Sequence, residues 1–174
     1  MEIELEKTYL LKYLPGDIKE KPSIEIFDIY IPKSVDHPHL RIRKRGEICE
    51  ITKKEPLNEN DSSEQSEHTI GLTEEEFSAL KDVDGKKLHK IRYKYPYGEN
   101  VAEIDVYRDD FEGLVFVDFE FKTREEKDAF VMPDFCLAET TQEKFCAAGW
   151  LAGKNYSDIE LFLNNYGYKK IMNI

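Results

Sequence analysis

Charged side chains recur at every second residue in several short segments, and each segment carries one sign of charge. Because successive side chains of a β-strand point to opposite faces, alternating charges within a strand share one face. The segments with acidic faces contain Glu2, Glu4 and Glu6, then Glu103 and Asp105, and then Asp118 and Glu120. The segments with cationic faces contain Arg41, Arg43 and Arg45, and then Lys90, Arg92 and Lys94. Such faces could hold a polyanion through arginine and lysine, and a hard divalent cation through paired carboxylates.

Two plainer interpretations compete with a binding site. The charges could lie on the solvated faces of an antiparallel sheet, or they could pair with one another inside a barrel. Ordinary solvated faces mix Thr, Ser, Lys and Gln, whereas these segments are almost purely cationic or purely carboxylate. This segregation favours a nucleotide or polyphosphate site with a bound metal, formed if the sheet curls so that the charged faces point inward.

The donor types indicate which metal such a site would hold. Carboxylates alone favour Mg²⁺ or Mn²⁺ over zinc. The spacing of the four histidines is not typical of a zinc site, and we expect all four on the surface: His37, His39, His68 and His89.

Apolar and polar alternation predicts the strands that position these residues. The predicted strands span residues 2–11, 24–31, 39–45, 48–54, 87–95, 101–108 and 114–121. Between them, residues 57–66 hold one apolar residue and no periodicity, which predicts a mobile loop that could order over a ligand.

Helices are predicted mainly in the later part of the chain. A Thr or Ser followed three residues later by Glu predicts helix starts at Thr73, Thr123, Thr140 and Ser157. Gly153 and Gly167 stand where C-terminal caps are expected, so the last quarter is interpreted as two short helices joined by a turn.

Length and composition limit the possible classes of protein. The 174 residues, 40% of them hydrophobic, indicate one globular domain over 1–174. A net charge of −11 argues against general nucleic-acid binding. Three cysteines without CxxC spacing favour a reducing compartment. The acidic start and the lack of a long apolar run predict a cytoplasmic protein that does not bind a membrane.

Taken in order, the charged motifs resemble those of the CYTH family, the triphosphate tunnel metalloenzymes, along nearly the whole chain. That family includes class IV adenylyl cyclases, thiamine triphosphatases and inorganic triphosphatases. Its opening ExExK strand is similar to Glu4-Leu5-Glu6-Lys7-Thr8, and its RxR motif to Arg41-Ile42-Arg43. The later family motifs resemble Lys54, Lys90-Ile91-Arg92, Glu103-Ile104-Asp105 and Asp118-Phe119-Glu120.

The resemblance implies an α+β fold dominated by strands: an eight-stranded antiparallel barrel, with charged tunnel walls and helices packed outside. It also implies roles for individual residues. Metal binding falls to Glu4, Glu6, Asp118 and Glu120. Substrate binding falls to Arg41, Arg43, Lys54, Lys90 and Arg92. The residues central to catalysis would be Glu4, Glu6, Arg41 and Arg43. Possible further members are Glu103, Asp105 and Lys154, although a lysine at a helix end more often interacts with the helix dipole.

The sequence departs from the family pattern at three places. Thr8 stands at the place of the motif's lysine, and Lys7 should face the other way unless a bulge turns it inward. Asp118 replaces a glutamate, which shortens the reach by one methylene. Glu67 has no acidic partner two residues on, where Thr69 stands.

The expected function is metal-dependent hydrolysis of a triphosphate, either inorganic tripolyphosphate or an organic or nucleoside triphosphate, by a monomer or homodimer. The alternatives are a class IV-type adenylyl cyclase, a non-catalytic triphosphate sensor, and a structural barrel whose charges neutralise one another. Because no base-reading motif stands out, the triphosphatase is favoured over the cyclase.

Overall fold

The structure is a computed structural model, in which residues 2–58 and 60–172 are described. The strands are β1 (Glu2–Leu11), β2 (Ser23–Ile31), β3 (Leu40–Arg45), β4 (Ile48–Asn58), β5 (Asp61–Leu72), β6 (Lys86–Tyr97), β7 (Asn100–Tyr107), β8 (Val115–Phe121) and β9 (Cys136–Glu139). The helices are α1 (Glu74–Leu80), α2 (Arg124–Ala129), α3 (Ala148–Leu151) and α4 (Tyr156–Asn165). Short 3₁₀ turns span Ile18–Glu20, Asp109–Phe111 and Lys144–Cys146.

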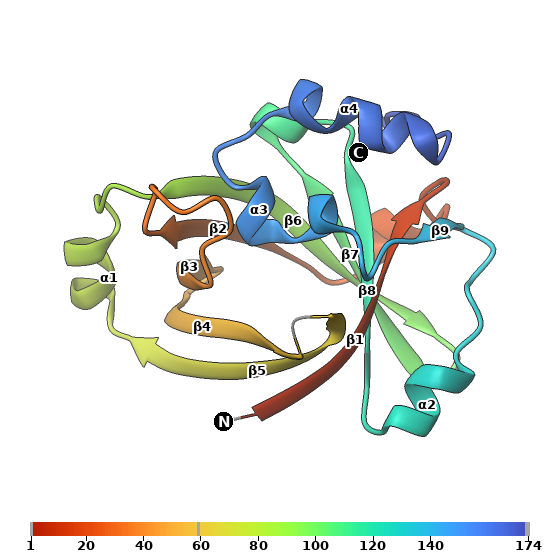
Figure 1. The fold of residues 1–174 in the computed structure, drawn as a ribbon, viewed down its shortest axis with the longest axis horizontal. Coiled ribbons are helices and arrows are strands. Elements are labelled where there is room, and N and C mark those ends of the chain that lie inside the picture. The colour runs from red at the N-terminus through yellow and green to blue at the C-terminus, as the bar shows by residue number, and fades with distance from the viewer. Residues whose placement is uncertain (1, 59, 173–174) are drawn as a thin grey trace.

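Eight antiparallel strands close into a barrel (Figure 1). Their order around the wall is β5-β4-β3-β2-β6-β7-β8-β1, and β5 pairs with β1 to close the ring. The short strand β9 adds to the end of β1 beyond this ring. The predicted eight-stranded antiparallel barrel in a strand-dominated α+β fold is therefore confirmed.

The prediction of a mobile loop over residues 57–66 was wrong. Strand β4 continues to Asn58, and β5 begins at Asp61 and pairs with both β4 and β1. Polar side chains on both faces of β5 hid its period, and the pairing partners that make it a strand lie elsewhere in the sequence. Glu59 lies outside the described residues.

The predicted helix starts had mixed outcomes. Thr73 and Thr123 cap α1 and α2 as expected. Helix α4 starts earlier than predicted, with Asn155 rather than Ser157 as its N-cap. Thr140 starts no helix, because its backbone N–H bonds to the carbonyl of Thr8 and extends the sheet edge. The capping-box pattern depends on neighbouring residues alone, so it could not predict a contact with Thr8, which is distant in the sequence.

Gly153 and Gly167 both adopt positive φ, as expected of residues that end helices. The two short helices predicted for the last quarter are confirmed as α3 and α4.

Apolar residues form two clusters, on different faces of the barrel wall. The first covers the outside of β1, β7 and β8 and includes Tyr9, Ile104 and Phe119. The second lies inside one end of the barrel, where Leu10 and Phe116 meet Leu151 and Ile159 from α3 and α4. Helices α3 and α4 therefore close one end of the barrel, whereas α1 and α2 flank its wall (Figure 1).

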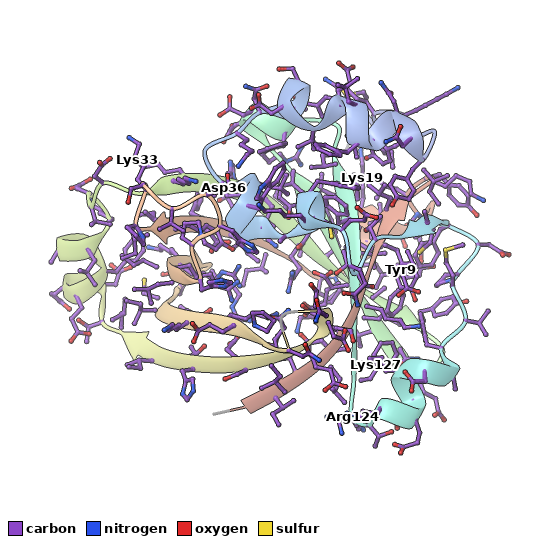
Figure 2. The ribbon with its side chains drawn as sticks, viewed as in Figure 1. Tyr9, Lys19, Lys33, Asp36, Arg124 and Lys127 are labelled. Carbon is purple, nitrogen blue, oxygen red and sulfur yellow. The ribbon has the colours of Figure 1, made fainter. Side chains whose placement is uncertain are left out.

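Helix α2 is tied to the start of β5 by polar contacts. The buried Lys127 ammonium donates to the Ser63 hydroxyl at 2.6 Å, and Arg124 forms a forked pair with Glu64; Lys127 and Arg124 are labelled in Figure 2. Within the described ranges, no helix is long and apolar enough to cross a bilayer.

Candidate functional site

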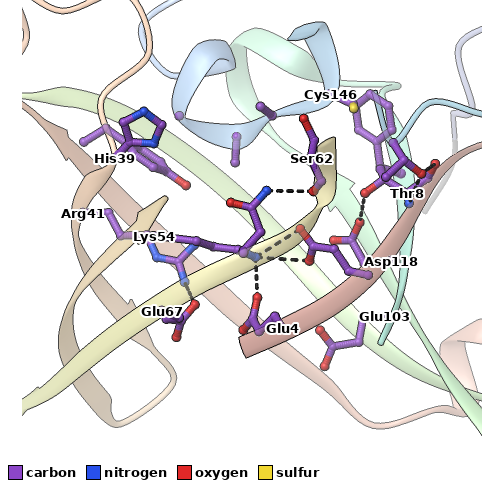
Figure 3. Close-up of a pocket in the computed structure, with 18 of the residues that line it drawn as sticks. Glu4, Thr8, His39, Arg41, Lys54, Ser62, Glu67, Glu103, Asp118 and Cys146 are labelled. Atoms are coloured by element: carbon purple, nitrogen blue, oxygen red, sulfur yellow. Dashed lines mark hydrogen bonds and ion pairs between the residues drawn. The ribbon is translucent and has the colours of Figure 1, made fainter. Parts of the chain in front are cut away.

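The barrel encloses a cavity of about 810 Å³ that is lined mainly by charged and polar side chains (Figure 3). All eight barrel strands contribute to it, together with the loop after β2 and residues 141–149. The strand residues with charge in this lining are Glu4, Glu6, Arg41, Arg43, Arg45, Glu50, Lys54, Glu67, Lys90, Arg92, Lys94, Glu103, Asp118 and Glu120.

Strand register explains why these residues meet. Residues directly opposite each other in neighbouring strands share a face. Glu6 lies opposite Glu120, and Asp118 lies opposite both Thr8 and Glu103, so β1, β8 and β7 together form an acidic wall. The cationic residues come from β3, β4 and β6, around the rest of the ring.

The structure brings every predicted metal-binding and substrate-binding residue to this cavity. Of the three possible members, Glu103 lines the cavity and Asp105 is buried behind Lys90 and Arg92. Lys154 lies outside this lining: it contacts Asp36 at 3.1 Å and donates to the carbonyl of Trp150 at 2.8 Å. Because that carbonyl belongs to α3, Lys154 interacts with the end of that helix in this structure.

Lys54 lies between two glutamates of β1 (Figure 3). Its ammonium is 2.5 Å from Glu4 Oε2 and 3.1 Å from each carboxylate oxygen of Glu6. Burial alone would lower the pKa of Lys54, but the charges of Glu6 and Glu4 outweigh burial and raise this pKa above its ordinary value. A cation therefore already occupies the space between these carboxylates.

Several other cations are paired with buried acids. Arg43 forms a forked pair with Asp28, with Nε–Oδ1 and Nη2–Oδ2 distances of 2.6 and 2.8 Å. Asp105 accepts from both Lys90 and Arg92. Burial would raise the pKa of Asp105, but the charges of Arg92 and Lys90 hold this pKa well below its ordinary value. Internal pairing, one of the plainer interpretations of the sequence, thus holds for part of the cationic set.

The acidic wall has two carboxyl groups with raised pKa values. Burial, together with the charges of Glu6 and Asp105, raises the pKa of Asp118 to about 6. Burial, with the charges of Glu103 and Glu4, raises the pKa of Glu120 to about 7. Because these carboxylates are buried and repel one another, binding of a further cation beside them would be favourable.

These residues fit a hard divalent metal by the chemistry of their donors. Glu4, Glu6, Asp118 and Glu120 offer only carboxylate oxygens, and Glu4 Oε2 is buried without a hydrogen bond of regular geometry, although the Lys54 ammonium is nearby. In the described part of the chain, no three acidic, His or Cys side chains already converge as metal ligands. Lys54 contacts Glu4 and Glu6, and Arg92 contacts Asp118, so these carboxylates now face protein cations.

Comparison with known proteins finds a similar sequence and similar folds. An inorganic triphosphatase from Nitrosomonas europaea is 28% identical over 144 residues, which cover 81% of this chain and 91% of the relative. A crystal structure of an inorganic triphosphatase superposes with a TM-score of 0.64 at 22% identity, covering 88% of this chain and 97% of that one. The chain is therefore similar in sequence and in fold to inorganic triphosphatases.

A more distant solved structure has a similar fold. A Bacillus halodurans protein provisionally described as an adenylate cyclase has a TM-score of 0.53 at 13% identity, over 99% of this chain and 94% of that one. No protein-family model matches the chain.

Thr8 occupies the place of the CYTH motif lysine in the cavity, as the strand alternation predicts. Thr8 faces the cavity and its hydroxyl donates to Asp118 Oδ1 at 2.7 Å. Lys7 lies on the opposite face, 3.6 Å from Glu139, and the β1–β8 register shows no bulge there. At the third departure from the family pattern, the Thr69 hydroxyl donates to Glu67.

Sequence reasoning missed several residues of the cavity. His37 is half-buried and lines the cavity, because the loop after β2 folds against residues 147–149. His39 is exposed, as expected, and also lines the cavity. Burial and the nearby His39 lower the pKa of His37 to about 4. His68 is exposed as expected, and His89 lies between Glu25 and Asp109 on the outer face.

Some of the other missed lining residues could have been predicted from the alternation of side chains along the strands. Glu50 alternates with Thr52 and Lys54 along β4, and Tyr30 faces inward opposite Arg41. Cys146 belongs to a 3₁₀ turn at the closed end, where no periodic signal exists.

Proposed function

We propose that the protein hydrolyses a linear triphosphate with the help of a divalent metal, Mg²⁺ or Mn²⁺. The observation that carries this proposal is one barrel cavity in which a cationic set faces an acidic wall. A triphosphate brings several negative charges, which cannot be buried without neighbouring cations. The relative at 28% identity is an inorganic triphosphatase, which supports inorganic tripolyphosphate as the substrate.

Arg41 is the best placed of the predicted phosphate ligands. Among the described residues its one ionic contact is with Glu67 at 3.9 Å, and its buried Nε has no hydrogen-bond partner there. A guanidinium with unsatisfied N–H groups suits forked contacts with phosphate oxygens. Arg43 and Lys90, which are held by Asp28 and Asp105, would instead set the positive potential and the shape of this wall.

The acidic wall would bind the metal through Glu4, Glu6, Asp118 and Glu120. When bound, the metal would supply charge neutralisation at the phosphate oxygens. The protein would contribute position: the cations fix the triphosphate, and Glu4 or Glu6 orients the attacking water toward the terminal phosphorus. Lys54, released from its glutamates, would turn its ammonium toward the same phosphate.

Thr8 supports a second candidate, a protein that binds triphosphate without turnover. A threonine in place of the motif lysine removes one cation from the acidic wall. A class IV-type cyclase is the remaining enzyme alternative, and the fold alone does not separate it from a triphosphatase. The cytoplasmic location, the monomer or homodimer state and the absence of nucleic-acid and membrane partners stay predictions.

The test is phosphate release from tripolyphosphate, ATP and thiamine triphosphate with Mg²⁺ or Mn²⁺. We expect release from tripolyphosphate that is lost in both Arg41→Ala and Glu4→Ala. Lys53→Ala is the matched control, because Lys53 neighbours Lys54 on the outer face and should leave the rate unchanged. Tripolyphosphate binding without phosphate release would identify the sensor, and pyrophosphate release from ATP alone would identify the cyclase.

A further inference from the structure

A groove lies on the outer wall of the barrel, apart from the charged cavity. It has a volume of about 530 Å³, and helix α1 and residues 108–111 contribute its sides. Its floor is the outer face of β2 and β6, where the Phe27 side chain is 44% exposed. A hollow of this size is typical of sites for small organic molecules. The function proposed above gives this groove no role.

Strand register aligns a row of outward side chains across the floor of the groove. Phe27 on β2 lies opposite Lys44 of β3 and His89 of β6. Beyond His89, the Arg108 backbone N–H donates to the His89 carbonyl at 3.0 Å, which places Arg108 next in the row. Lys87 lies two residues before His89 and therefore on the same face of β6. Lys87 and Arg108 are thus both neighbours of His89.

The aromatic part of the floor is held in place by polar contacts. The rings of Phe27 and His89 are stacked, with centroids 4.2 Å apart and an interplanar angle of 18°. The two ring nitrogens of His89 bond to Glu25 and Asp109, each at 2.9 Å. Phe77 of α1 adds a further ring to the lining. Rings that are already fixed and partly exposed favour the binding of a flat aromatic group.

Cations without partners line the same groove. Lys81, Lys87 and Arg108 form no ion pair with any residue that the structure describes, and Arg108 is half-buried. Two lining carboxylates, Asp82 and Asp110, form none either, so the unpaired groups comprise three cations and two acids. The chain as a whole has a net charge of −11, so this excess of positive charge is local. An anionic group would supply the partner that Arg108 lacks.

We propose that this groove is a binding site for a small aromatic anion, a flat ring system that carries a sulfonate, carboxylate or phosphate group. The ring packs against Phe27 and Phe77, and the anionic group contacts Arg108 and Lys87. The barrel wall separates this site from the cavity, because Lys90, the residue after His89, faces inward. The site is therefore independent of the proposed hydrolysis.

The experiment is a fluorescence titration with anilinonaphthalene sulfonate, an aromatic anion, in EDTA. The matched probe is phenylnaphthylamine, which keeps the rings but lacks the sulfonate. We expect the anion to bind more tightly than the neutral probe by about tenfold, the value of one charge-assisted contact. Arg108→Gln should remove this preference, whereas Arg124→Gln, on α2 outside the groove, should keep it.

Two further variants use exposed side chains, whose replacement should leave the fold intact. Lys87→Gln should reduce the preference for the anion, and Phe27→Ala should weaken the binding of both probes. Tripolyphosphate and the Arg41→Ala variant should leave both affinities unchanged, because Arg41 lies in the barrel cavity.

Equal affinities of the wild-type protein for the two probes would overturn the proposal. The same holds for an unchanged preference in both Arg108→Gln and Lys87→Gln. Displacement of the anionic probe by tripolyphosphate would place it in the barrel cavity and would also overturn the outer site.

Discussion

Metal affinity of this protein should depend steeply on pH between 6 and 8. The cause is the raised pKa of two acidic-wall carboxyl groups, about 6 for Asp118 and about 7 for Glu120. A carboxyl group binds a metal as the carboxylate, so a proton on either group competes with the metal.

The size of the effect follows from the two pKa values. Glu120 is ionised in about 9% of molecules at pH 6 and about 91% at pH 8, a tenfold change. Asp118 goes from about half to almost fully ionised, which adds a factor of about two. If both carboxylates bind the metal, its affinity should rise about 20-fold from pH 6 to pH 8.

The assay is titration with Mn²⁺, with the free ion measured by electron paramagnetic resonance at pH 6, 7 and 8. In Glu120→Gln the affinity should be lower at pH 8, and the remaining pH dependence should shrink to about the twofold contribution of Asp118. Glu99→Gln, in the turn between β6 and β7, serves as a control that keeps the wild-type profile. A wild-type affinity that changes less than about threefold would refute the reasoning.

The same two groups also contribute to the stability of the metal-free protein. Their folded-state pKa values are raised, so these two groups hold more protons in the folded protein than in the unfolded chain between about pH 4 and 7. Their contribution to the free energy of unfolding is therefore complete below pH 4 and is lost as the pH rises through 7. Saturating metal should reverse this trend.

Three further predictions concern the protein's own contacts. Asp28→Ala leaves the Arg43 charge buried and should cost about 3–5 kcal/mol in guanidinium unfolding, whereas an apolar replacement of both partners should cost far less; equal costs would contradict the pairing. Lys54→Met should raise Mn²⁺ affinity without triphosphate, because Lys54 no longer competes for its glutamates; weaker Mn²⁺ binding would show that Lys54 supports the metal site instead. Gly149→Ala should lower the melting temperature, since a Cβ there would lie 2.5 Å from the carbonyl of Pro38, at a cost of about 1–3 kcal/mol; an unchanged melting temperature would place that loop differently.

The sequence alone determines which side chains share a face of each strand. Alternation has a period of two and is a local property, so the inward positions of Glu4, Arg41 and Lys90 could be predicted without a structure. The barrel itself was implied by the resemblance of the ordered motifs to the CYTH family, and the replacement of the motif lysine by Thr8 was visible in the same register.

Tertiary structure decided which charges meet across the cavity. Lys54 lies between Glu4 and Glu6 because β5 pairs with both β4 and β1, a contact that closes the barrel. Strand β5 itself escaped the sequence pattern because polar residues occupy both of its faces. Arg43 is held by Asp28, whereas the Arg45 Nε has no hydrogen-bond partner within residues 2–58 and 60–172, although both arginines have the same parity on one strand. Parity fixes the face of a strand, but the partner across the cavity depends on the stagger between strands, which arises only when the whole sheet closes.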